Sequence, residues 1–314
     1  MEDTYKISVV VPFFNCGKLI ENCLNSILRQ SYKNFEVLMI DDGSVDDSKN
    51  YALKFCKDSR FKYMYKENSG VSDTRNFGLN NVNGDYVSFV DCDDILHPDF
   101  FKVLLDLSVK NGKCVTSCIR KEFNDSIEWD TTNIKTNKIK DVVLNDEFSH
   151  ENHWEAGVVW GKLFPISVIK NIRFDVRYHV SEDTLFFMQV LIAAKHYFLI
   201  DAQMYGYRIL QNSAIHGTYN QRKHTQIYAI EEISDLVNPF SYKDFVFMRG
   251  QLVATCKKAA KTYNRNDAIW DEIKKYFRNN YQYCNNKTII QKLSNDIFYL
   301  SPELYRWMVG QKNI

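Results

Sequence analysis

Hydrophobic positions in the first 120 residues alternate between short continuous runs and helical spacing. The runs predict four strands, and the first is typical of a strand buried on both faces: ISVVVPF (7–13), FEVLMI (35–40), FKYMY (61–65) and DYVSFV (85–90). Between the runs, apolar residues recur every three or four positions, as they do from Leu19 to Leu28, and this spacing predicts helices. Strands that alternate with helices predict a mainly parallel α/β sheet.

The pattern is less regular in the middle of the chain and becomes helical toward the end. CVTSCI (114–119) predicts another strand, and the polar residues 120–145 predict a hairpin or a mobile loop. WGKLFPISVI (160–169) and SEDTLFFMQVLIAA (181–194) predict a short helix and a longer amphipathic one. Beyond about Tyr219 the apolar stripes are helical, so we expect a boundary near residues 212–222.

Composition narrows the class of protein. The 40 basic and 39 acidic residues leave a net charge of +1, so no overall field recruits nucleic acid or an anionic membrane. The acidic start, Met1-Glu2-Asp3, is unlike a signal peptide, and the apolar stretch from Leu185 to Ile200 is too short and too polar to span a bilayer. The eight cysteines lack paired spacing, which favours reduced thiols over a zinc site or disulfides. We therefore expect a cytoplasmic protein.

Carboxylates follow two of the predicted strands. FVDCDD places Asp91, Asp93 and Asp94 directly after an apolar run, and Asp41-Asp42 follow another. Like charges this close raise one another's pKa unless a positive charge lies between them, so the first cluster is either solvated or holds a cation. In parallel sheets, ligands bind beyond the carboxyl ends of the strands, where both clusters are expected.

Seven stretches in this order resemble bacterial glycosyltransferase family 2, which has the GT-A fold: SVVVPFFN, MIDDGSVDDS, ENSGVSDTRNFGL, DYVSFVDCDD, VVWGKLF, SEDTLFF and YGYRILQNSAIH. The resemblance covers about two thirds of the chain. It implies a GT-A domain over residues 1–218, with a nucleotide-sugar half at about 1–120 and an acceptor half at about 121–218. A C-terminal helical region over 219–314 lies outside the resemblance.

The resemblance implies that the DCDD segment binds the donor. Asp91, Cys92 and Asp93 would contact the nucleotide sugar, and Asp93 or Asp94 would hold Mn²⁺ or Mg²⁺ on its diphosphate. Side chains two apart in an extended segment face the same way, so Asp91 and Asp93 can converge on one site. His216 would approach the diphosphate or the metal. A solvated turn, with Asp94 capping the next helix, is the alternative.

Other residues would complete the donor site. Asp42 matches the position of a carboxylate that reads uracil, and Asp41 is a second expected nucleotide contact. Turn and helix-cap chemistry is the alternative for both residues, and the two roles can coexist. The rest of the base pocket is expected to come from Pro12, Phe14 and Asn15. Arg75 would reach a phosphate or pair with the acidic cluster, with a surface salt bridge as the alternative.

SEDTLFF would carry the acid–base chemistry. Ser181 is a candidate N-cap, and Glu182 and Asp183 in the first turn would be favoured by the helix dipole. The resemblance implies that Asp183 is the general base and that Glu182 tunes or orients it. It also places Trp160 and Lys162 on the acceptor side, although packing and surface roles explain them equally well.

The sequence therefore predicts an inverting, metal-dependent glycosyltransferase that uses a UDP-sugar. The acceptor would be a hydroxyl on a growing glycan, a lipid-linked or a protein-linked acceptor. A nucleotidyltransferase and a non-catalytic nucleotide-binding scaffold are the alternatives. The C-terminal helices would dock on the catalytic domain or on a second subunit, as in a homo-oligomer, or attach peripherally to the inner face of the membrane.

Overall fold

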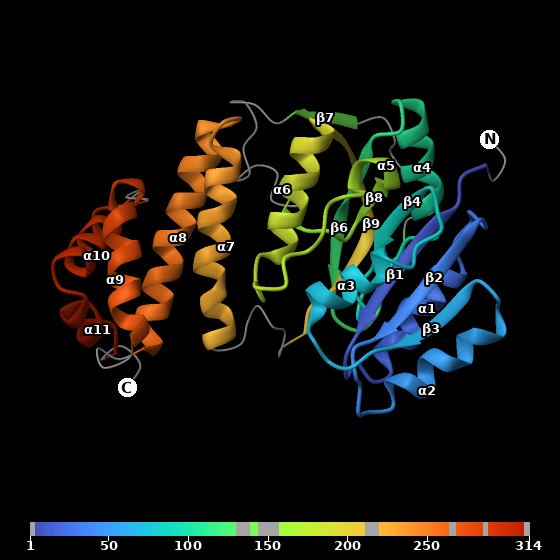
Figure 1. Cartoon of the computed structure of the whole chain (residues 1–314), viewed down its shortest axis with the longest axis horizontal. Helices are drawn as coiled ribbons and strands as arrows, with labels where there is room; N and C mark the ends of the chain where they lie inside the picture. Colours follow the sequence, from blue (N-terminus) through green and yellow to red (C-terminus); the bar gives the residue numbers. More distant parts are fainter. Residues whose placement is uncertain are drawn as a thin grey trace.

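The computed structural model describes residues 4–129, 139–143, 157–210, 220–263, 268–284 and 288–310. A sheet flanked by helices forms one side of the molecule, and a row of helices forms the other (Figure 1). Within the described residues, no helix combines the length and the apolar character that a membrane crossing requires.

The first part of the chain forms strands and helices in alternation: β1 (Ile7–Phe13), α1 (Leu19–Leu28), β2 (Phe35–Asp41), α2 (Ser48–Leu53), the 3₁₀ helix η1 (Lys54–Lys57), β3 (Phe61–Tyr65), α3 (Val71–Leu79) and β4 (Tyr86–Phe89). β1 pairs in parallel with β2 on one side and β4 on the other, and β2 pairs in parallel with β3. All seven residues of β1 are buried, as the unbroken apolar run predicts. The predicted parallel α/β arrangement is confirmed.

The middle part extends this sheet: β5 (Ile95–Leu96), α4 (Phe100–Lys110), β6 (Val115–Phe123), β7 (Ile139–Val143), β8 (Lys162–Pro165), α5 (Ile166–Ile169), α6 (Glu182–Ala194) and β9 (His196–Arg208). The strand order is β3-β2-β1-β4-β8-β6-β9-β5, and β7 also pairs with β9. β8 lies between β4 and β6 and is antiparallel to both. Helices α1 and α4 cover one face of the sheet, and α3 and α6 cover the other.

Two sequence predictions for this part need correction. The helix predicted over 160–169 is half a strand, because Lys162–Pro165 pairs with β4 and β6 and only Ile166–Ile169 is helical. The polar stretch 120–145 contains strand at both ends, since β6 continues to Phe123 and β7 begins at Ile139. β7 pairs with β9, so β6 and β7 are not a simple hairpin. The intervening residues 130–138 lie outside the described part.

The last part of the chain is helical: α7 (Gln221–Val237), α8 (Tyr242–Thr262), α9 (Ala268–Asn280), the 3₁₀ helix η3 (Tyr281–Tyr283), α10 (Ile289–Leu300) and α11 (Pro302–Gly310). Side-chain caps begin three of the helices, with Asn220, Ser241 and Thr288 each accepting a backbone hydrogen bond. Figure 1 shows the helices in sequence order, with α7 nearest the sheet and α10 and α11 farthest away.

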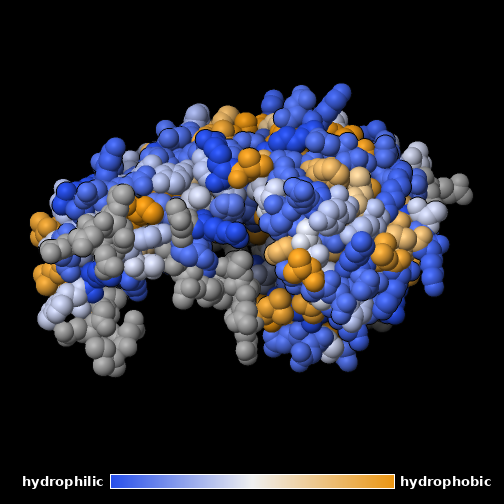
Figure 2. All heavy atoms as spheres, turned by 60° about the horizontal axis from the view of Figure 1, so that its bottom comes forward, coloured by the Kyte–Doolittle hydropathy of each residue, from blue (hydrophilic) through white to orange (hydrophobic). Residues whose placement is uncertain are grey.

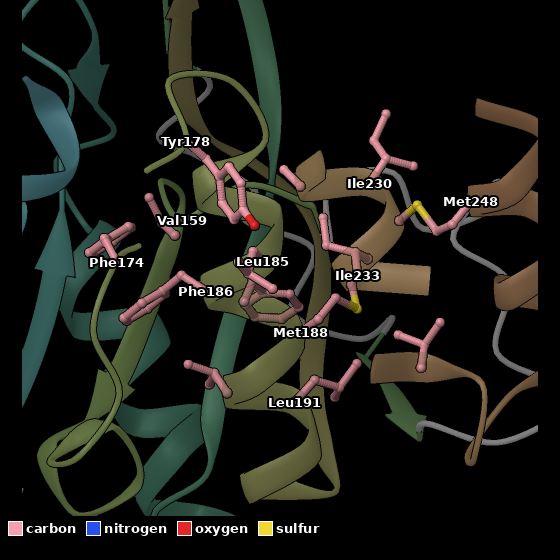
Figure 3. Packing of buried hydrophobic residues seen from close by; sticks show 14 of the residues in the cluster. Val159, Phe174, Tyr178, Leu185, Phe186, Met188, Leu191, Ile230, Ile233 and Met248 are labelled. Carbon is pink, nitrogen blue, oxygen red and sulfur yellow. The ribbon is translucent and has the colours of Figure 1, made fainter. Parts of the chain in front are cut away.

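The helical part shares a hydrophobic core with the sheet part. In Figure 3, Tyr178, Leu185 and Met188 lie toward Ile230 and Ile233 of α7, and all five are buried. The same buried cluster continues through α8 and α9. The helices therefore dock on the sheet part of this same chain, which is one of the placements that the sequence predicts.

The two last helices keep apolar side chains at the surface. Ile290 and Leu300 of α10 are 79% and 77% exposed, and Trp307 of α11 is 61% exposed. Figure 2 shows apolar side chains at the left edge of the molecule, where Figure 1 places these helices. Elsewhere the face in Figure 2 is mostly polar, as expected of a surface in water.

Candidate active site

Arg75 joins two groups of carboxylates at the carboxyl edge of the sheet. Its guanidinium donates from Nη2 to Asp91 Oδ1 at 3.0 Å and from Nη1 to Glu182 Oε1 at 3.1 Å. Arg75 is only 5% exposed, and burial makes these pairs stronger than surface pairs. The structure therefore realises the predicted pairing with the acidic cluster and adds a link to the start of α6, which the sequence analysis did not foresee.

Helix α3 puts Arg75 in this position. Gly70 precedes the helix with φ +95°, a backbone conformation that favours glycine. Gly78 then lets α3 lie directly on the sheet, because a Cβ there would be 2.5 Å from Val10 Cγ1 and 2.9 Å from Ile40 Cδ1. Arg75, on this closely packed helix, lies between Asp91, which follows β4, and Glu182 of α6.

Asp183 has an environment suited to accepting a proton. Burial raises its pKa to about 7, and the negative charge of Glu182 acts in the same direction. Arg75 and a hydrogen bond from the Thr184 N–H to Asp183 Oδ1, at 2.7 Å, oppose the rise. A carboxyl group that titrates near neutral pH is ionised in part at working pH and holds a proton well, which suits a general base.

The DCDD segment divides into distinct roles. Asp94 is buried, and its two oxygens accept hydrogen bonds from the Tyr205 hydroxyl at 2.7 Å and the Arg208 N–H at 2.8 Å. Asp94 thus anchors β9 beside the end of β4. Asp93 is half-buried, and burial together with the charge of Asp91 raises its pKa to about 6. Of the two expected metal ligands, the geometry favours Asp93, because both Asp94 oxygens already have donors.

A divalent ion would find few protein ligands here. Among the described residues, no group of three or more Asp, Glu, His or Cys side chains is arranged to hold a metal ion. His216 lies outside the described residues. A single carboxylate in a negative field still fits Mg²⁺ or Mn²⁺ when substrate phosphates supply the other oxygens, as is common for these ions. Asp93 meets that description.

The residues expected to form the base pocket lie at the ends of β1 and β2. Phe13 of β1 is the register partner of Asp41 in β2, so the segments after the two strands are neighbours. Pro12 is buried, and Phe14 is 49% exposed. Asn15, with φ +49°, donates from its N–H to Ser44 Oγ at 3.0 Å and accepts from the Val45 N–H at 2.9 Å.

The carboxylates of Asp41 and Asp42 are both occupied by protein donors. Asp41 accepts from the Ser44 N–H and the Tyr63 hydroxyl, each at 2.7 Å. Asp42 accepts from four donors in the loop that follows β3, namely Lys66 Nζ (2.8 Å), Ser69 N (3.0 Å), Gly70 N (2.9 Å) and Asn68 Nδ2 (3.3 Å). Turn chemistry thus describes Asp41, and a base could bind Asp42 only by sharing or displacing one of these donors.

Three residues of the site were assigned no role from the sequence, namely Lys66, Tyr205 and Arg208, although the last two lie in the YGYRILQNSAIH stretch. Lys66 pairs with Asp42 and, at 3.0 Å, with Asp73. Burial alone would lower the pKa of Lys66, but these two partners raise it above the ordinary value. Tyr205 and Arg208 hold Asp94 from β9, more than 110 residues away in sequence. No local spacing rule connects positions so distant, although Lys66 directly precedes the ENSG stretch.

The two residues expected to contact the acceptor, Trp160 and Lys162, are both buried. Trp160 is 6% exposed, and its ring stacks on Tyr205 with the centroids 4.8 Å apart. Lys162 is fully buried in β8, with Nζ 4.7 Å from the ring centroid of Phe187 in α6. Both therefore pack inside the molecule, in agreement with the packing role that was the alternative to acceptor contact. Cys92 is half-buried, and its thiol lies against that of Cys16.

Comparisons with known proteins agree with this geometry. Residues 8–169 match the model of the family described as Glycosyl transferase family 2. "Glycosyltransferase GlyA" of Streptococcus pneumoniae is 30% identical over 246 residues, which are 76% of this chain and 35% of that protein. "Uncharacterized glycosyltransferase EpsJ" of Bacillus subtilis is 27% identical over 214 residues, 66% of this chain and 62% of its own. The chain thus spans only part of the length of these relatives.

Solved structures show the same fold. Residues 1–349 of Staphylococcus aureus TarS, in complex with UDP-GlcNAc, superimpose with a TM-score of 0.68 at 17% identity, covering 98% of this chain and 92% of that one. The mannosyltransferase PcManGT from Pyrobaculum calidifontis, in complex with GDP-Man and Mn²⁺, gives a TM-score of 0.52 at 13% identity, covering 96% and 89%. At such low identity the likeness concerns the fold, and it extends through the C-terminal helices.

Proposed function

Because the chain belongs to glycosyltransferase family 2 and has its GT-A fold, we propose that this glycosyltransferase moves a sugar from a UDP-sugar to an acceptor hydroxyl, with inversion at the anomeric carbon. The observation that carries the proposal is the buried Arg75, which ties Asp91 on the donor side to Glu182 beside Asp183. The UDP-GlcNAc in the TarS complex supports a UDP-linked donor.

The donor would lie across the ends of β1, β2 and β4. The base would meet the segment of Phe14 and Asn15, and the diphosphate would lie beside Asp91 and Asp93. Asp93, together with diphosphate oxygens, would hold a Mn²⁺ or Mg²⁺ ion. When bound, such an ion stabilises the negative charge on the departing diphosphate. The Mn²⁺ in the PcManGT complex is consistent with this assignment.

Asp183 would act on the acceptor. Its carboxylate takes the proton of the acceptor hydroxyl while the hydroxyl oxygen bonds to the anomeric carbon from the face opposite the diphosphate. The bond between the anomeric carbon and the diphosphate oxygen breaks, UDP leaves, and the configuration inverts in one displacement. Arg75 holds Glu182 in place beside Asp183, and the negative charge of Glu182 helps to raise the pKa of the base.

In line with the family assignment, we propose that the acceptor is a hydroxyl on a growing glycan, a glycolipid or a glycoprotein. The nucleotidyltransferase alternative predicts pyrophosphate as a product, whereas sugar transfer predicts UDP. The scaffold alternative predicts neither product. The family assignment favours sugar transfer over both.

A panel of nucleotide sugars tests the proposal. The protein is mixed with UDP-GlcNAc, UDP-GalNAc, UDP-glucose, UDP-galactose and GDP-mannose, and both the melting temperature and the released phosphate product are measured. A ligand at 100 times its Kd adds about 2.7 kcal/mol of stability, which a melting curve detects. We expect stabilisation by at least one UDP-sugar, with slow UDP release as water replaces the acceptor. Stabilisation by GDP-mannose alone, or release of pyrophosphate, would contradict the proposal.

A further inference from the structure

The segment that leads into Asp183, residues 174–181, is held from two sides. On the first side is α3, the helix that carries Arg75. Asn76 makes a pair of hydrogen bonds with the backbone of Phe174, one from Nδ2 to the carbonyl oxygen and one from the Phe174 N–H to Oδ1, both at 2.8 Å. Ser72 Oγ donates to the Tyr178 carbonyl oxygen at 3.5 Å. The segment is thus bonded to α3 at both Phe174 and Tyr178.

The other side of the segment is held by α7, the first helix of the C-terminal part. Glu232 Oε2 accepts from the Tyr178 hydroxyl at 2.6 Å. Thr225 Oγ1 accepts from the His179 N–H at 3.1 Å. These bonds come from two turns of α7 and reach residues that lie four and five positions before Asp183.

The third contact from α7 reaches Ser181, where the backbone is strained. Ser181 has φ +68°, a left-handed conformation that costs a non-glycine residue about 1 kcal/mol or more. As the residue before α6 it was a candidate N-cap, but its side chain makes no capping bond. Its Oγ instead accepts from Gln226 Nε2 at 3.3 Å. The serine that sets the start of α6 is therefore bonded to α7.

We propose that α7 positions the general base, and that Thr225, Gln226 and Glu232 are the positioning residues. The inference rests on the proposed role of Asp183. Apolar packing of Leu185 and Met188 against α7 already joins the two parts of the molecule (Figure 3). The three polar residues add a different constraint, because all of them bind the few residues before Glu182 and Asp183. They fix the direction in which the first turn of α6 presents its carboxylates.

Loosening this constraint has a consequence that a structural role alone lacks. Burial is the largest cause of the raised pKa of Asp183. A first turn that moves admits water, so the pKa of Asp183 falls toward the ordinary value for aspartate. The rise of turnover with pH then shifts to lower pH, while the maximum rate falls because the base is out of place. The donor site, on the ends of β1 to β4, is unchanged.

The experiment uses the double variant Thr225→Val/Gln226→Ala in the full chain. UDP release from the best UDP-sugar of the panel, with water as the acceptor, is measured from pH 5 to 9. We expect kcat to fall about ten-fold, the scale of a base displaced by a fraction of an ångström, with KM for the donor unchanged. The midpoint of the rise with pH should move down by about half a unit. The single variant Thr225→Ser, in which Gln226 is unchanged, should keep the kcat and the pH profile of the parent, since serine retains the hydroxyl.

Controls separate this inference from the function on which it rests. Gln251→Ala changes an exposed glutamine in α8 and should leave kcat and the pH profile unchanged. If Asp183→Asn keeps turnover, the proposed base is wrong. If Asp183→Asn is inactive but the double variant keeps both kcat and the pH profile, only the positioning role is wrong. Should the double variant fail to fold, Gln226→Ala alone is judged by the same two readouts.

Discussion

Replacing Arg75 with methionine should weaken the fold and move the pH range of activity. The change removes the positive charge between Asp91 and Glu182 while keeping an unbranched side chain of similar length. Removing one partner of a buried ion pair typically costs 3–5 kcal/mol. The Glu182 side chain is 11% exposed and the Asp91 side chain is 30% exposed, so water screens part of the interaction between Arg75 and Asp91. We therefore expect the lower end, a loss of about 3 kcal/mol at pH 8.

The loss should depend on pH in a defined direction. Asp183 has a native pKa of about 7, above its value of about 3.9 in unfolded chains, so the native state binds more protons between these limits. Its contribution to stability is present at low pH and is lost as pH rises through 7. Arg75 lowers the pKa of Asp183, so without Arg75 that pKa rises further. The destabilisation should be smaller at pH 5, where Asp183 is protonated, than at pH 8.

Urea unfolding at pH 5 and pH 8, followed by circular dichroism, measures both effects. UDP release against pH should show its rise displaced to higher pH, opposite to the shift expected from loosening α7. Arg60→Met is the matched control, because Arg60 pairs with Asp58 in a partly exposed position and such pairs contribute about 0–1 kcal/mol. A loss in Arg75→Met no larger than in Arg60→Met, with an unchanged pH profile, would refute the reasoning.

Three further changes have definite expected outcomes. Asp93→Asn should be more stable than the parent above pH 6, because burial and the charge of Asp91 disfavour the ionised carboxyl in the native state. It should nevertheless lose the recovery of UDP release that Mn²⁺ gives after chelation, and recovery as in the parent would remove Asp93 as a ligand. Asp94→Asn should lower the free energy of unfolding in urea by about 1–3 kcal/mol, because the new amide NH₂ faces a hydrogen-bond donor, Tyr205 or Arg208. An unchanged unfolding midpoint would contradict the anchoring role. Gly78→Ala should cost about 1–3 kcal/mol by overpacking against β1, and a neutral result would show that α3 can move away.

The parallel core could be predicted from the sequence because its signals are local. The run ISVVVPF became β1 over the same residues, and FKYMY became β3 over the same residues. β1 is buried along its whole length, and a strand buried on both faces needs an unbroken apolar run, with which nothing nearby competes. The helix predicted over 181–194 also rests on a local pattern, and it is confirmed: α6 begins one residue later, at Glu182, and ends at Ala194.

The rest of the fold depends on partners far away in sequence. Lys162–Pro165 is a strand because β4 and β6 supply its hydrogen bonds, which a helical spacing of apolar residues cannot reveal. Lys162 shows the same limit: a lysine after Trp-Gly suggests a surface position, yet its side chain is buried under α6. Tertiary pairing outweighed local preference at both places.

The sequence predicted the location of the candidate site but not the contacts within it. The position of Asp91 to Asp94 after a strand predicted where the carboxylates gather. It could not predict that Asp94 is engaged by Tyr205 and Arg208, nor that Arg75 reaches Glu182 across 107 residues. Those partners lie on β9, α3 and α6, and only the folded chain brings them together. The distinction between a binding carboxylate and an anchoring one lies in these distant donors.

In the proposed mechanism, Asp183 accepts the proton of the attacking hydroxyl. Asp183→Asn keeps the shape of the side chain and removes its ability to take a proton, so donor binding and folding should persist. UDP release from the best UDP-sugar of the panel, measured beside the donor-induced rise in melting temperature, should fall about 10²–10⁴-fold, while the rise in melting temperature stays as in the parent. Asp106→Asn, in an exposed pair with Lys102, is the control and should change neither quantity. Turnover of Asp183→Asn within a few-fold of the parent would contradict the account.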